Sequence, residues 1–71
     1  MNVEMLRLLV EIFTTSKEFD EKRFYSKFPI EASATRKDLD VLKNLGYINM
    51  VYTSGTICDI TVSQKAIDYF K

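Results

Sequence analysis

Apolar side chains recur at helical spacing at the start of the chain. At about 100° per residue, the apolar positions of residues 3–13 sweep about 220° of a helical wheel, and Glu4, Arg7 and Glu11 share the remainder. The pattern predicts a helix over residues 3–13. Because this arc is wider than one buried stripe, we expect one flank to meet the domain core and the other to meet a second chain or a later helix.

A second helix is predicted after the polar connector TTSKE. Asp20 is a suitable N-cap, and Phe19 before it is placed to pack on Phe24 as a hydrophobic staple. The helix should run to about Lys27, because Pro29 disfavours helical geometry at the residue before it. A turn is expected to follow.

The stretch SATRKDLDVLKNLGYI, residues 33–48, predicts a third helix that runs directly into a strand. Ser33 is the expected N-cap, and Gly46 is expected to end the helix as a C-cap. The side of the helix that should face the core carries Thr35, Leu39, Leu42 and Leu45.

Strand-like alternation follows in YINMVYT and again in TICDITV. The turn residues Ser54 and Gly55 lie between the two runs, which predicts a β-hairpin. Ser63 is then the expected cap of a closing helix, QKAIDYFK, with Ala66, Ile67 and Phe70 on its inward face. The chain is thus predicted to be one α+β domain, residues 1–71, with three helices, a two-stranded hairpin and a short C-terminal helix.

Composition narrows the class of protein. The chain has 71 residues, of which 46% are hydrophobic and 28% charged, and no apolar run approaches the roughly 20 residues of a membrane span. Glu4 and Glu11 interrupt the apolar N-terminal stretch, which disfavours a signal peptide. We therefore expect a soluble, cytoplasmic protein.

The inventory of reactive side chains is short. The sequence has one cysteine and no histidine, so neither an internal disulfide nor a structural zinc site is expected. No titratable base suited to neutral pH is evident, and a substrate pocket is not visible in the pattern. We expect no cofactor and no enzymatic activity.

Two segments resemble a known family. The spacing Leu39-x-x-Leu42-x-x-x-Gly46-Tyr47-Ile48 is similar to a recognition helix running into the first wing strand, and residues 60–66 resemble the end of a wing passing into a helix. The family is the winged helix-turn-helix domain of bacterial and phage regulators, such as the multiple-antibiotic-resistance-type and phenolic-acid-type repressors. Ser63 and Ala66 stand where that pattern usually has threonine and glycine.

The resemblance implies a sequence-specific DNA-binding transcriptional regulator that inserts its recognition helix, residues 33–45, into the major groove of double-stranded DNA. Arginine and lysine can bind guanine or phosphate, and asparagine can pair with adenine. The first-turn amides of the helix can also hold a phosphate. The residues expected to contact DNA are Lys22, Ser33, Arg36, Lys37, Asp40, Lys43 and Asn44 from the helices, and Thr53, Ser54 and Thr56 from the hairpin tip.

Several features favour other interpretations. Ten basic residues balance ten acidic ones, Asp40 would repel phosphate, and the hairpin tip carries no cation. The charged face of the third helix could be simply a solvated surface. An alternative function is a protein-binding winged-helix adaptor or inhibitor, such as one encoded by a mobile element, that does not bind DNA.

Self-association is the remaining expectation. Two copies with recognition helices about 34 Å apart could read a palindrome, whereas one copy with so few cations would bind weakly. The surface expected to form a homodimer carries Met5, Leu8, Ile12, Tyr69 and Phe70. The alternative is that the domain's own core covers this flank of the first helix.

Overall fold

The structure, a computed structural model, describes the backbone of residues 1–53 and 56–71 and the side chains of residues 1–52 and 59–71. In chain order the elements are α1 (Val3–Ser16), α2 (Glu21–Lys27), α3 (Ser33–Asn44), β1 (Ile48–Thr53), β2 (Thr56–Val62) and α4 (Gln64–Tyr69). Four helices and a two-stranded antiparallel sheet confirm the predicted α+β class. None of the helices in the described residues has the length and apolar character needed to cross a membrane.

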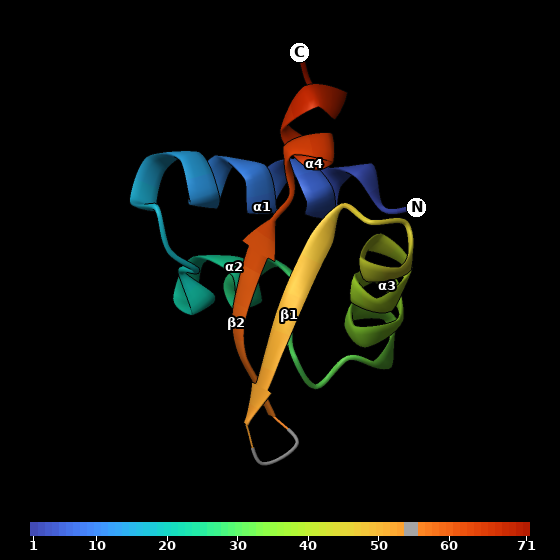
Figure 1. The fold of residues 1–71 in the computed structure, drawn as a ribbon. Coiled ribbons are helices and arrows are strands. Elements are labelled where there is room, and N and C mark those ends of the chain that lie inside the picture. The colour runs from blue at the N-terminus through green and yellow to red at the C-terminus, as the bar shows by residue number, and fades with distance from the viewer. Residues whose placement is uncertain (54–55) are drawn as a thin grey trace.

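The helices gather around one face of the hairpin. In Figure 1, α1 crosses behind the hairpin, α3 stands beside β1, and α4 rises from the end of β2 over α1. The core lies where these elements meet and is built from side chains of all six. Its fully buried members include Phe24 from α2, Leu39 and Leu42 from α3, Ile48 from β1 and Ala66 from α4.

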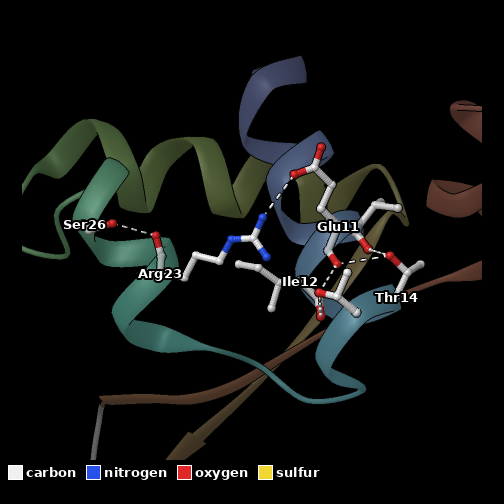
Figure 2. Close-up of polar contacts among 7 residues, drawn as sticks. Glu11, Ile12, Thr14, Arg23 and Ser26 are labelled. Carbon is white, nitrogen blue, oxygen red and sulfur yellow. Dashed lines mark hydrogen bonds and ion pairs between the residues drawn. The ribbon is translucent and has the colours of Figure 1, made fainter.

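The first helix is longer than predicted and has a cap that the sequence pattern did not identify. The side chain of Asn2 accepts a hydrogen bond from the backbone N–H of Met5 at 3.0 Å, which caps the N-terminus of α1. At the other end, the hydroxyl of Thr14 donates to the carbonyls of Val10 and Glu11 (Figure 2). Residues 14–16 continue the helix, where the sequence predicted a polar connector.

The second helix begins as predicted. The carboxylate of Asp20 accepts a hydrogen bond from the N–H of Arg23 at 3.1 Å, and the rings of Phe19 and Phe24 lie 5.7 Å apart. The predicted N-cap and hydrophobic staple are both confirmed. Figure 2 shows Arg23 also reaching Glu11 of α1, with 3.3 Å between Nη2 and Oε2, so a surface ion pair joins the first two helices.

The third helix buries all but one of the side chains predicted to face the core, and it is capped differently. Thr35, Leu39 and Leu42 are buried, whereas Leu45 is 44% exposed because it is the C-cap and turns away from the core. The N-cap is Ala32, so the prediction of Ser33 was wrong by one residue. A turn closed by the Ala32 N–H on the Pro29 carbonyl brings the chain into helical geometry earlier than the sequence indicated.

Gly46 ends the third helix as predicted. Its φ of +83° is the left-handed conformation that glycine adopts without penalty. The N–H of Gly46 bonds to the carbonyl of Lys43 and that of Tyr47 to the carbonyl of Leu42, both at 3.0 Å, which is the Schellman arrangement. The chain therefore reverses within two residues and enters β1 beside the helix it has just left.

The hairpin pairs Ile48 with Val62 at its base and Val51 with Asp59 further out. The next pair, Tyr52 with Ile57, leaves Cys58 as an additional residue in β2, which makes a β-bulge. The predicted turn at Ser54 and Gly55 lies outside the described residues.

Ser63 occupies the N-cap position of α4, but its hydroxyl does not cap that helix. The hydroxyl instead donates to the carbonyls of Gly46 at 2.7 Å and Tyr47 at 3.0 Å. The ammonium of Lys65 donates to the carbonyl of Leu45 at 2.6 Å and lies 4.6 Å above the ring of Tyr47. The start of α4 thus satisfies the free carbonyls at the end of α3 and fixes α3 against the hairpin.

Candidate nucleic-acid interface

The outward face of α3 carries the cations that the sequence assigned to it. Arg36, Lys37 and Lys43 are exposed; Lys37 lies opposite the buried Leu39 and Leu42, whereas Arg36 and Lys43 lie together on one flank of the helix. The periodicity of the helix produces this separation, because positions 35, 39 and 42 fall within about 60° of one another on the wheel. The helix is therefore anchored by one face and presents the other to the surroundings.

Asp40 and Asn44 share this outward face and are exposed as well. Within the part of the chain that the structure describes, no ion pair joins Asp40 to Arg36 or Lys43, and none engages Lys37. The other carboxylate of the helix, Asp38, turns the opposite way and accepts a hydrogen bond from the Asn2 amide at 3.0 Å. The three cations remain available to an external anion.

Lys43 also contacts the hairpin. Its ammonium lies 5.7 Å from the centre of the Tyr52 ring, within the range of a cation–π interaction. Tyr52 is 47% exposed, and its hydroxyl makes a long contact of 3.8 Å with the sulfur of Met50. Helix and hairpin thus form one continuous surface at this point. The sequence did not single out Tyr52, because the contact depends on how β1 lies against α3.

Two further predicted DNA-contacting residues have different surroundings, and only Lys22 is placed less favourably. Lys22 lies in the first turn of α2, where it borders an open hollow together with three carboxylates, those of Glu18, Asp20 and Glu21. Those carboxylates oppose the approach of a phosphate. Ser33 is exposed at the first position of α3 and makes no capping hydrogen bond, so its hydroxyl remains free to act as a donor in the described part of the chain.

The hairpin tip was predicted to contribute hydroxyl groups. Ser54 lies outside the described residues, and so do the side chains of Thr53 and Thr56. Their assignment to the interface stays a prediction.

The residues predicted to form a dimer interface do not lie together on the surface. Met5 and Ile12 are 0% and 1% exposed and belong to the core, so assigning them to an interface was wrong. The wide apolar arc of α1 is covered within the chain, because β2 packs on one flank and α4 on another. Leu8 and Phe70 are half-buried against the same core, and Tyr69 remains exposed.

An apolar flank of α3 was missed. Val41 and Leu45 are 40% and 44% exposed, one helical turn apart. They lie on the side of α3 away from Arg36 and Lys43, which are seven residues apart and share the other flank. Leu45 was assigned to the buried leucine spacing and Val41 was given no role, so this flank was not identified from the sequence.

No group of three or more carboxylate and cysteine side chains in the described residues is arranged to hold a metal ion. Comparison of the chain with models of known protein families, with curated proteins and with solved structures gave no match.

Proposed function

We propose that the chain is a winged helix-turn-helix domain that binds double-stranded DNA and regulates transcription. In this proposal α2 and α3 are the helix-turn-helix, α3 is the recognition helix, and the β1–β2 hairpin is the wing. The observation that carries the proposal is the polar surface of α3, where Arg36, Lys37 and Lys43 are exposed while the side of the helix with Leu39 and Leu42 is buried.

The chemistry of this face suits a DNA groove. Arginine can fork onto guanine, and lysine can bind guanine or phosphate. Asn44, one turn from Asp40, has the amide that pairs with adenine, and a carboxylate such as that of Asp40 can accept from the amino group of cytosine. An exposed face with this mixture of groups can read bases as well as bind phosphate.

The N-terminal end of α3 supports the proposal in a second way. Ala32 has no side chain that can cap the helix, so the first-turn amides have no side-chain acceptor in the described residues. Amides in that position, together with the positive end of the helix dipole, favour an anion. A DNA phosphate beside Ser33 would satisfy them.

A second candidate function is the binding of a partner protein. The exposed Val41 and Leu45 favour it, because DNA contacts are mostly polar and charged whereas protein contacts bury apolar side chains. The equal numbers of acidic and basic residues are also compatible with it. In this interpretation the polar face of α3 is a solvated surface.

Binding to a mixed-sequence duplex over a range of salt concentrations tests the proposal. We expect retention of the duplex at low salt, and a loss of affinity in Arg36→Ala plus Lys37→Ala of about 30-fold near 0.15 M salt if both cations contact phosphate. The slope of log affinity against log salt should become shallower by about 1.8. Alanine is a good helix former, so α3 itself should remain folded in this variant.

A charge-matched control separates local contact from overall charge. Lys17→Gly plus Lys71→Ala removes the same two positive charges from positions after α1 and after α4, and glycine suits the left-handed backbone of Lys17 at φ 63°. This control should bind almost as well as the unaltered chain. Equal losses in both double variants, or no binding by the unaltered chain even at low salt, would contradict the proposal and favour the protein-binding candidate.

A further inference from the structure

We infer that Tyr52 is a positioning residue for DNA binding: its ring holds the ammonium of Lys43 at the junction of recognition helix and wing, where that ammonium binds a backbone phosphate. The inference rests on the proposed function and names the contact with DNA that is made where α3 meets the hairpin. The observation behind it is the 5.7 Å between the Lys43 nitrogen and the centre of the Tyr52 ring.

The hairpin has no cation of its own. Over residues 48–62 the only charged side chain in the sequence is Asp59. Asp59 pairs with Val51, which is exposed, and successive side chains of a strand point to opposite faces. Tyr52 therefore shares the other face with Ile48 and Met50, and its contact with the Met50 sulfur agrees with this.

That shared face is the one against which α3 packs, because Ile48 is fully buried and Met50 is packed on the core. Tyr52 extends the same row beyond the core, where it is half-exposed. The stem of Lys43 leans toward the N-terminal end of α3, as helical side chains do, and its ammonium reaches the ring. The helix thus places a positive charge on the face of the hairpin that carries no negative one.

The ring has a physical effect on the lysine. A free lysine side chain samples many rotamers, and fixing its ammonium on a phosphate costs rotamer entropy. An aromatic face beneath the ammonium restricts this freedom before DNA arrives, and the N–H donors on the far side of the nitrogen can still bind a phosphate. The phenol hydroxyl is not required for this effect, so phenylalanine should substitute for Tyr52.

A double-mutant cycle tests the inference. Affinity for a mixed-sequence duplex is measured for the unaltered chain, Lys43→Gln, Tyr52→Leu and the double variant, with Tyr52→Phe alongside. We expect Lys43→Gln to lower affinity about five-fold near 0.15 M salt and to make the salt slope shallower by about 0.9. Tyr52→Leu should lower affinity about two- to five-fold alone and not at all in the Lys43→Gln background, and Tyr52→Phe should bind normally.

Two controls distinguish this result from damage to the hairpin. Val51→Ala weakens the same strand on the opposite face, and Lys71→Gln removes a distant charge, so both should retain affinity. Without DNA, the ε-methylene protons of Lys43 should show a ring-current shift in the nuclear magnetic resonance spectrum that is lost in Tyr52→Leu and kept in Tyr52→Phe.

Several results would overturn the inference while leaving DNA binding intact. They are an equal loss in Tyr52→Phe and Tyr52→Leu, an undiminished effect of Tyr52→Leu in the Lys43→Gln background, or no effect of either Tyr52 variant on affinity. Failure of the unaltered chain to bind any duplex at low salt would instead remove the proposed function and this inference together.

Discussion

Tyr25 is held by its ring rather than by its hydroxyl. The ring packs edge-on against Phe19 and Phe24, with centroid distances of 5.8 Å and 5.2 Å. The hydroxyl oxygen is buried, and the described residues offer it no hydrogen-bond partner. Burial, followed by the nearby Glu21 carboxylate, raises the pKa of this phenol above its usual 10.0. A buried donor without an acceptor destabilises the folded state.

We therefore expect Tyr25→Phe to increase the free energy of unfolding by about 1 kcal/mol. The change removes the unpaired hydroxyl and keeps the aromatic packing. The measurement is urea unfolding at neutral pH, and a decrease in stability would show that the hydroxyl has a partner, such as an ordered water.

The raised pKa of Tyr25 predicts that the stability of the fold changes with pH in the alkaline range. Because the pKa of Tyr25 is higher in the folded chain, the unfolded chain releases the phenol proton first as pH rises. The stability that comes from this difference in proton binding is fully present below pH 10 and is lost as pH rises through the folded pKa. The unaltered chain should therefore lose more stability above pH 10 than Tyr25→Phe. Parallel alkaline titrations of the two proteins would contradict the assigned cause.

Among the elements, α3 depends most on its connections to the rest of the chain. Asn2 holds Asp38 on one side, Ser63 and Lys65 bind the carbonyls at its end, and Lys43 lies over Tyr52 on the hairpin side. Each connection comes from a different element. The orientation of the polar face of α3 is therefore a property of the assembled domain and not of the helix alone.

Asn2 combines two roles that can be separated by substitution. Serine can still cap α1 but is too short to reach Asp38, whereas alanine can do neither. We expect Asn2→Ser to lower the free energy of unfolding by about 0.5 kcal/mol, and Asn2→Ala by about 1 kcal/mol more. Thermal or urea unfolding measures both.

A matched change on α3 checks the assignment. Asp38→Asn keeps an acceptor for the Asn2 amide and should be milder than Asp38→Ala. If Asn2→Ser proved as unstable as Asn2→Ala, the capping bond to Met5 would be contributing little, and the contact with Asp38 would be the main role of Asn2.

For the molecule as a whole, burial of Met5 and Ile12 changes the expected assembly. A stable dimer buries roughly 800 Å² on each partner, and the apolar side chains left exposed outside α3 and the hairpin are scattered single residues such as Val3 and Tyr69. We expect the free chain to sediment as a monomer at micromolar concentration and to bind a palindromic duplex as two copies.

Sedimentation with and without duplex measures both states. The two copies would be brought together by the spacing of half-sites rather than by the apolar flank of α1. A free dimer that Tyr69→Ala dissociates would show instead that the α4 end of the molecule forms an interface, as the sequence suggested.

The elements with local signals were predicted well. Asp20 and Phe19 predicted the start of α2, because a cap and a hydrophobic staple act within one helical turn. Gly46 predicted the end of α3, because a residue with left-handed backbone conformation is needed at that point. The outward placement of Arg36, Lys37 and Lys43 followed from the helical period alone. Ser33 was misassigned as a cap because serine is a common cap residue, whereas the predicted turn from Pro29 to Ala32 is closed by a backbone hydrogen bond and makes Ala32 the cap.

The sequence by itself determined the order and type of the elements, and which face of α3 is apolar, because caps, turns and periodicity act between residues a few positions apart. Only the tertiary structure decided that the wide apolar arc of α1 is covered by β2 and α4, that Ser63 and Lys65 bind the end of α3, and that Lys43 meets Tyr52. These contacts join residues from separate elements, so their geometry depends on how the elements pack, which no local pattern encodes.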